Sequence, residues 1–115
     1  KHPPDLVGRY HFYEKGEDWQ SDSRDLTLEP DGDAIYHISE VWDRDTDSDW
    51  KHRGTWEASG DSVTFQATGA TGKENYNSDS TRASSLIVKF ARMSLSGSDV
   101  VGLAVGNIAL RKVSS

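Results

Sequence analysis

Four aspartates alternate along residues 43–49, in the stretch DRDTDSD. Carboxylates at the first, third and fifth positions are the oxygen ligands with which a calcium-binding loop begins. The stretch then departs from that pattern, because Ser48 occupies the sixth position, where the loop needs glycine, and Gly54 the twelfth, where it needs glutamate. The spacing favours a solvated acidic hairpin tip. The alternative is a weak metal site with the ligands Asp43, Asp45 and Asp47.

The histidines do not have the spacing of a zinc site carried by a helix. His37 and His52 could face each other across the hairpin that joins residues 34–42 to residues 51–58. We expect both to lie on the solvent-exposed face. No metal and no cofactor are expected.

Two short stretches resemble catalytic motifs but lack their defining residues. The stretch TGATGKE, residues 68–74, has Glu74 where a phosphate-binding loop needs serine or threonine. The stretch GDSV, residues 60–63, lacks the flanking glycines of a serine nucleophile and is explained by a tight turn. No catalytic residue is therefore expected.

The sequence predicts that the elements that position these residues are β-hairpins. In LTLEPDGDAIYHI, residues 26–38, apolar residues alternate before and after the turn residues Pro30 to Asp33. Alternation with period two is typical of a half-buried strand, and Pro and Gly supply the dihedral angles of a tight turn. Further strands are expected at residues 7–14, 51–58, 62–67, 84–95, 100–105 and 108–113.

Two segments are expected to form loops. Residues 15–24 are polar and could hold one helical turn, and residues 68–83 are long, polar and rich in Gly, Ser and Thr. Long loops in compact domains are functional or disordered. The pattern as a whole predicts an all-β chain, an antiparallel up-and-down barrel of about eight short strands in a single domain, residues 1–115.

Four stretches of the chain carry a resemblance to a known family. They are LVGRY (6–10), LTLEPDGDAIY (26–36), GTWEASGDSVTF (54–65) and LSGSDVVGLAVGNIALRKV (95–113). Together they resemble small bacterial lipocalin-like (calycin-type) barrels. The resemblance implies a barrel with a ligand-sized interior but no particular ligand. The chain departs from lipocalins at Gly8-Arg9-Tyr10, where they carry Gly-x-Trp, and it ends at its last strand without their helix.

The inward-facing positions of such a barrel define the candidate ligand-binding residues. Trp42 and Trp56 either line a ligand or plug the barrel ends, and Trp56 is expected in the core. Glu40 and Arg92 would either pair within the cavity or lie solvated at the rim, because an unpaired buried charge is costly. The predicted ligand-binding residues are Tyr10, Phe12, Tyr36, Glu40, Trp42, Trp56, Phe90 and Arg92.

Composition limits the partners. The 115 residues carry a formal net charge of -6, so neither nucleic acid nor an anionic membrane surface is expected. The absence of cysteine excludes disulfides and thiolate chemistry, and no apolar run is long enough for membrane insertion. The start at Lys1 without Met favours an exported protein, periplasmic or secreted.

Three functions fit these observations. The first is a non-enzymatic binding module that holds a small apolar or amphipathic molecule in the barrel. The second is an acidic interaction or inhibitor domain for a basic protein, which the aspartates of residues 43–49 would serve. The third is a small barrel isomerase or cyclase that uses Glu14 or Glu40 as its acid or base.

Overall fold

The computed structural model describes residues 2–75, 86–95 and 99–114. Eight antiparallel strands follow one another in chain order and close into a barrel through pairing of the first strand with the last. The prediction of an all-β up-and-down barrel is confirmed. The strands are β1 (Gly8–Lys15), β2 (Ser21–Leu28), β3 (Asp33–Asp43), β4 (Thr46–Ser59), β5 (Ser62–Asn75), β6 (Leu86–Leu95), β7 (Asp99–Val105) and β8 (Ile108–Ser114), preceded by a 3-10 turn, η1 (Pro4–Leu6).

Tight turns connect the strands where the sequence predicts them. Between β2 and β3, the Glu29 amide donates to the Asp33 carbonyl over 2.9 Å, and the Asp33 amide donates to the Asp31 carboxylate over 3.0 Å. Gly32 adopts a φ of 96° and Gly60, between β4 and β5, a φ of 58°. Side chains with a Cβ rarely adopt such angles, so glycine fixes both hairpins.

Large side chains fill the barrel interior. Tyr36 packs edge-on against Phe90 with ring centroids 5.4 Å apart, and against Phe65 at 5.9 Å. Such edge-to-face pairs add to the stabilisation from apolar burial. The largest fully buried side chains are Trp56, Tyr10, Tyr36, Phe65, Phe90, Leu6, Leu26, Leu28, Leu103 and Leu110.

The N-terminal segment covers one end of the barrel. The Tyr10 hydroxyl donates to the Leu6 carbonyl over 2.7 Å, which ties η1 to β1. The His2 ring lies 4.9 Å from the Trp56 ring, and its Nε2 contacts the Trp56 carbonyl at 2.9 Å. Trp56 in turn donates its indole N–H to the Glu29 carbonyl over 2.8 Å. Trp56 is a core residue, as the sequence predicts.

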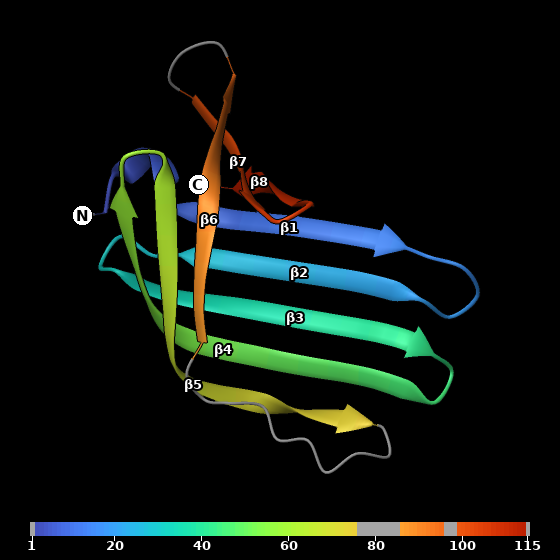
Figure 1. Cartoon of the computed structure of the whole chain (residues 1–115). Coiled ribbons are helices and arrows are strands. Elements are labelled where there is room, and N and C mark those ends of the chain that lie inside the picture. Colours follow the sequence, from blue (N-terminus) through green and yellow to red (C-terminus); the bar gives the residue numbers. More distant parts are fainter. Residues whose placement is uncertain (1, 76–85, 96–98, 115) are drawn as a thin grey trace.

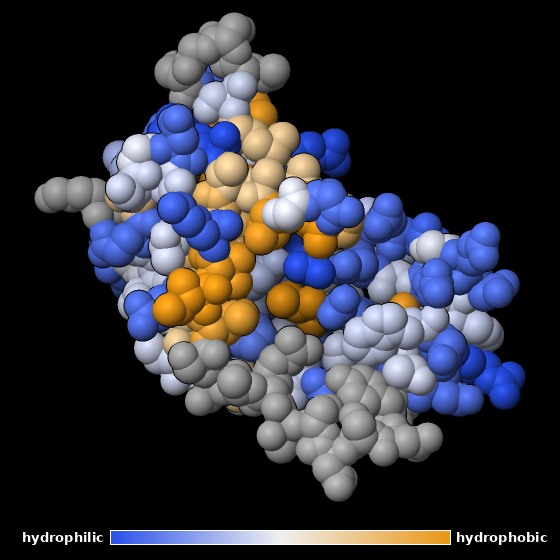
Figure 2. Space-filling model, viewed as in Figure 1, coloured by the Kyte–Doolittle hydropathy of each residue, from blue (hydrophilic) through white to orange (hydrophobic). Residues whose placement is uncertain are grey.

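At the other end, the strands of one wall continue past the rest of the barrel. Figure 1 shows the far ends of β1 to β5 extending beyond β6, β7 and β8. Within the described residues, β5 pairs only with β4 after Ala67, and β1 pairs only with β2 after His11. We call this five-stranded part the projecting sheet. Apolar surface gathers over β6, whereas the projecting sheet is mainly hydrophilic (Figure 2).

Two expected loops are wrong in part. Residues 21–24 form the start of β2 rather than part of a loop, Lys15 ends β1, and the β1–β2 connection is reduced to residues 16–20. Residues 68–75 continue β5, while the remainder of the expected loop, residues 76–85, lies outside the described residues. Both polar segments become strands because a neighbouring strand pairs with them, which overrides their low intrinsic preference for β structure. No helix in the described part of the chain is long and apolar enough to span a membrane.

Candidate functional site

The inner face of the projecting sheet is organised in rows of directly paired residues. The row nearest the core, here the core row, is apolar except for one histidine, and the next, here the middle row, mixes aromatic, aliphatic and charged side chains. The outermost, here the acidic row, carries carboxylates from four strands. The core row is Tyr10, Leu26, Tyr36, His52 and Ala70; the middle row is Phe12, Arg24, Ile38, Trp50 and Gly72; the acidic row is Glu14, Asp22, Glu40, Ser48 and Glu74.

A register shift in β5 decides which of its residues belong to these rows. Gly54 pairs with Ala67 and Arg53 pairs with Gly69, so Thr68 is an extra residue in the β4–β5 ladder. An extra residue of this kind reverses the facing of everything that follows it. Glu74 therefore faces inward, and its neighbour Lys73 is exposed.

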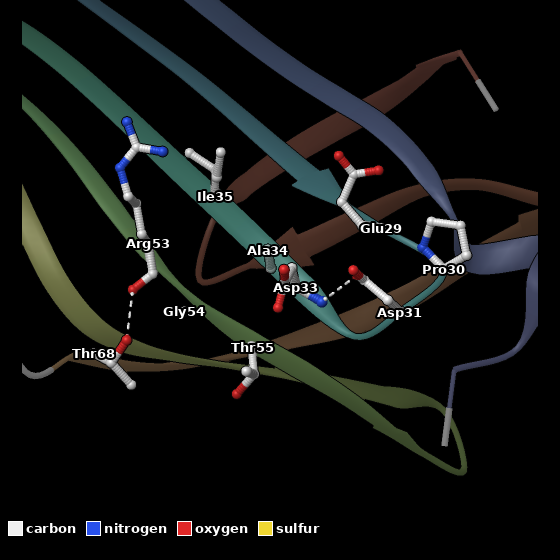
Figure 3. Close-up of a pocket in the computed structure, with 10 residues that line it drawn as sticks. All are labelled: Glu29, Pro30, Asp31, Asp33, Ala34, Ile35, Arg53, Gly54, Thr55 and Thr68. Carbon is white, nitrogen blue, oxygen red and sulfur yellow. Dashed lines mark hydrogen bonds between the residues drawn. The ribbon is translucent and has the colours of Figure 1, made fainter.

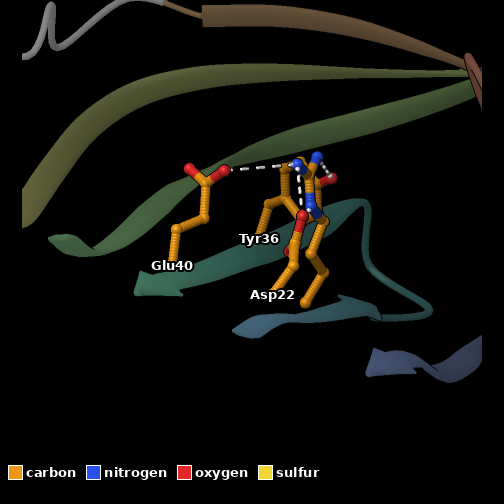
Figure 4. Close-up of polar contacts among 4 residues, drawn as sticks. Asp22, Tyr36 and Glu40 are labelled. Atoms are coloured by element: carbon orange, nitrogen blue, oxygen red, sulfur yellow. Dashed lines mark hydrogen bonds and ion pairs between the residues drawn. The ribbon is translucent and has the colours of Figure 1, made fainter. Parts of the chain in front are cut away.

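Arg24 is the cation on this face, and three acceptors surround it (Figure 4). Its guanidinium binds the Asp22 carboxylate through two hydrogen bonds, of 3.0 and 3.2 Å. It also donates to the Tyr36 hydroxyl over 3.1 Å, and the Glu40 carboxylate lies 3.9 Å away. Only 18% of the Arg24 side chain is exposed. The charge is thus held in place by its hydrogen bonds to Asp22 and Tyr36.

The surroundings of Arg24 and Tyr36 shift the pKa values of both side chains. Burial alone would lower the pKa of Arg24, but the hydrogen bonds to Asp22 and Tyr36 outweigh it and raise the pKa. Burial raises the pKa of the Tyr36 phenol, and the neighbouring Arg24 only partly offsets this. Arg24 remains charged and Tyr36 remains neutral at physiological pH.

Trp50 lies on β4, in the middle row between Ile38 of β3 and Gly72 of β5. Its indole N–H donates to the Glu74 carboxylate over 3.0 Å. A Cβ at Gly72 would lie 2.9 Å from Cδ2 of the Trp50 ring and 2.0 Å from the Asp49 carbonyl oxygen. Glycine at this position therefore lets the indole approach the backbone of β5. The result is a half-buried aromatic surface beside the acidic row.

Glu40 and Ser48 are direct partners in the β3–β4 ladder and share the inner face. Glu40 is 26% exposed and forms an ion pair with Arg24 at 3.9 Å. Ser48 is 2% exposed, and its hydroxyl has no hydrogen-bond partner among the described residues. A buried hydroxyl without a partner is destabilising, so this pair of positions has unused hydrogen-bonding capacity.

A hollow of about 260 Å³ lies over this end of the sheet. The carboxylates of Glu14, Asp22 and Glu40 line it together with Trp42, whose side chain is 41% exposed. A larger hollow of about 610 Å³ lies on the outer face beside the β2–β3 turn, between Ile35, Arg53 and Thr68 (Figure 3). Polar groups that line this hollow are already hydrogen-bonded to one another: the Thr68 hydroxyl donates to the Arg53 carbonyl, and the Asp33 amide donates to the Asp31 carboxylate. We therefore place the candidate site on the inner face.

The predicted ligand-binding residues separate into three groups. Tyr10, Tyr36, Trp56 and Phe90 are fully buried and fill the core. Phe12, Glu40 and Trp42 belong to the inner face of the projecting sheet or the hollow over it. Arg92 lies at the opposite end of the barrel.

The alternative in which Glu40 pairs with Arg92 inside a cavity is not formed. Arg92 binds the carboxylate of Asp5, a residue of η1, over 2.6 Å. Glu40 lies far along β3 and approaches Arg24 instead. The alternation of apolar residues predicts that both charged side chains lie on the inner face. It does not predict how far along the barrel each one lies, and the two are at opposite ends.

The expectation that both histidines lie on the solvent-exposed face is wrong for His52 but not for His37. His52 pairs with Tyr36 and is fully buried on the inner face, whereas His37 lies on the outer face, with Nε2 2.7 Å from the Asp49 carboxylate. His37 pairs directly with Lys51, the residue before His52. Adjacent residues of a strand point to opposite faces, so His52 points away from His37.

The acidic stretch 43–49 forms the tip of the β3–β4 hairpin. The Asp45 amide donates to the Asp43 carboxylate over 2.8 Å, which explains the aspartates as turn residues. Asp47 already belongs to β4, where it pairs with Val41. Among the described residues, no three His, Cys, Asp or Glu side chains lie close enough to hold a metal ion.

Sequence reasoning missed Asp22, Arg24, Ser48 and Glu74. All four lie in segments expected to be loops, where no facing could be assigned. The available signal was the pair Asp22 and Arg24, two residues apart and so on the same face of any strand that contains them. The shift at Thr68 concealed Glu74, because simple alternation from Phe65 points Lys73 inward instead.

Comparisons with protein-family models, with curated proteins and with solved structures find no match to this chain. The structure therefore defines its class by architecture alone: an eight-stranded, closed antiparallel β-barrel with one projecting wall.

Proposed function

We propose that this chain is a lipocalin-like, non-enzymatic binding module that holds a small amphipathic molecule on the inner face of the projecting sheet. One observation carries the proposal. Over three successive rows, the inner face changes from a packed apolar core to the half-buried aromatic rings of Phe12 and Trp50 and then to carboxylates. A ligand with an apolar body and a polar end matches that order.

The barrel interior is filled, which moves the proposed ligand outward from the cavity that the sequence suggested. Tyr36 and Phe90 occupy the centre of the barrel. Phe12 and Trp50, one row further out and both half-buried, supply the apolar contact, and the acidic row supplies the polar contact. Aromatic side chains with a few convergent polar groups are the usual composition of a ligand site.

Native mass spectrometry of the protein purified from its source, with a denatured control, tests whether it carries a ligand. Calorimetric titration with 1-naphthylmethanol, a neutral amphiphile, then tests the site. We expect saturable binding that Trp50→Ala weakens at least tenfold. Trp19→Ala is the matched control, because Trp19 is exposed in the β1–β2 connection. A naphthyl probe that does not bind, with no mass lost on denaturation, would overturn the proposal.

The acidic hairpin tip supports a second candidate function, docking of a basic protein. Asp43 and Asp45 at the tip and Asp49 on the outer face of β4 are exposed and remote from the barrel core. Electrostatic attraction to a basic surface would be strongest at low ionic strength. Titration with a lysine-rich peptide, against the triple variant Asp43→Asn, Asp45→Asn and Asp49→Asn, tests this. Equal affinity of the two proteins would eliminate the tip as the docking site.

A further inference from the structure

We infer that the polar end of the ligand is an organic ammonium group, bound at Glu40 beside the hydroxyl of Ser48. The inference rests on the proposed function and specifies the chemical class that the acidic row selects. It is carried by three independent observations: the charge of the inner face, the unsatisfied hydroxyl of Ser48, and the hollow beside Trp42.

The inner face carries an excess of negative charge. Across the described part of β1 to β5, its charged side chains are four carboxylates and one guanidinium. Two hydrogen bonds commit that guanidinium to Asp22. Glu40 is left with an ion pair at 3.9 Å, beyond hydrogen-bonding distance. A carboxylate in this position attracts a cation and repels an anionic ligand.

The Ser48 hydroxyl indicates where the cation binds. It is buried, lacks a hydrogen-bond partner within the described residues, and lies directly opposite Glu40. Cβ atoms at directly opposed positions lie about 5 Å apart, so one small group can contact both side chains. An ammonium group has three donors, and the Glu40 carboxylate and Ser48 oxygen are both acceptors. The Ser48 oxygen is buried and Glu40 lines the hollow, so an ammonium that enters from the hollow between the two side chains would satisfy both.

The surroundings fit an organic cation better than a metal ion. The carboxylates of the acidic row are spread over separate strands, and no three acidic or histidine side chains in the described chain are grouped for a metal. The hollow of about 260 Å³ over Glu40 has room for an alkylammonium. The indole of Trp42, which lines that hollow, offers a face for cation–π attraction.

Three probes that share one apolar body and differ in the charge of their polar end test the inference. They are 1-naphthylmethylamine, 1-naphthylmethanol and 1-naphthylacetate, titrated calorimetrically into the full chain at pH 7 and low ionic strength. We expect the amine to bind at least tenfold more tightly than the alcohol, and the carboxylate to bind more weakly than either. Added salt should reduce the preference for the amine.

Glu40→Gln should lower the affinity for the amine to that for the alcohol. The matched control is Asp47→Asn, which removes one charge from the same hairpin on its outer face. Ser48→Ala gives a second test, because it removes the hydroxyl without removing charge, and it should weaken amine binding while leaving alcohol binding unchanged. Circular dichroism of each variant checks that the barrel is folded.

The outcomes separate this inference from the proposed function. Equal affinities for the amine and the alcohol would overturn the ammonium assignment and leave the binding module standing. A preference for the amine that persists in Glu40→Gln would show that the cation binds elsewhere. Failure of all three probes would overturn the inference, and together with no mass lost on denaturation it would overturn the proposed function as well.

Discussion

The guanidinium of Arg24 and the hydroxyl of Tyr36 lie 3.1 Å apart, in hydrogen-bonding contact. The two residues belong to successive rows of the inner face, and the Tyr36 ring also packs against Phe90 in the core. One phenol therefore connects the packed barrel to the charged part of the projecting sheet. Its removal should affect both stability and the position of Arg24.

Tyr36→Phe should lower the free energy of unfolding by about 1–2 kcal/mol, because the ring packing remains and one hydrogen bond to a charged group is lost. Urea unfolding measures this. Tyr13→Phe is the control, since Tyr13 is exposed and should change little. In a double-mutant cycle with Arg24→Met, the two changes should be less than additive. Full additivity would contradict the coupling.

Stability should fall at high pH because of Tyr10. Burial, reinforced by the Asp5 carboxylate, raises the pKa of this phenol from 10.0 to about 12, although Arg92 lowers it. The unfolded chain loses the proton first, so the stabilisation is present below pH 10 and is lost as pH rises towards 12. Two pKa units correspond to about 3 kcal/mol at most.

Urea unfolding between pH 8 and pH 12 tests that expectation. Tyr10→Phe should have a shallower decline than the natural protein, with a residual slope from Tyr36, whose pKa is raised in the same direction. The variant should also lose about 1 kcal/mol at neutral pH, since the hydrogen bond to the Leu6 carbonyl is gone. Identical pH profiles would show that Tyr10 is not the group responsible.

Gly72→Ala should destabilise the protein by about 1–3 kcal/mol, because the new methyl group would overlap the Asp49 carbonyl and the Trp50 ring. Displacement of Trp50 should also shift the tryptophan emission. Gly69→Ala, in the same strand, is the control, since a Cβ at Gly69 meets no atom within 4 Å. Equal unfolding energies for the two variants would contradict the close approach of Trp50 to β5.

Deletion of Thr68 should leave the facing of the residues that follow it in β5 unchanged, because the pairs Gly54–Ala67 and Arg53–Gly69 then become successive pairs of a regular ladder. Glu74 would stay on the inner face and keep the hydrogen bond from Trp50, so the preference for the amine should persist in the titrations above. Deletion of Thr68 together with Gly69 removes one residue more than the extra one, so Lys73 would replace Glu74 on the inner face and the preference should be lost. Equal effects of the two deletions would contradict the placement of the extra residue at Thr68.

The sequence predicted the barrel because most strands alternate strongly and most turns carry glycine. Leu26, Leu28, Tyr36 and Phe65 all face the core, as their alternation indicates. The polar ends of β2 and β5 could not be predicted, because a strand of Ser, Asp, Gly and Thr is formed by its paired neighbour rather than by its own preference. The candidate site lies largely in those ends, so only its contributions from β1 and β3, including Phe12 and Glu40, were predicted.

The projecting sheet has a consequence for how the protein moves. Near Ala34, β3 is part of the closed barrel, while near Val41 it is part of the projecting sheet. Backbone amides should therefore exchange with deuterated solvent progressively faster along this single strand, since local opening costs less where fewer apolar contacts must be broken. Ligand binding should slow the exchange mainly at the far end, so that one strand reports on global unfolding at its start and on occupancy at its end.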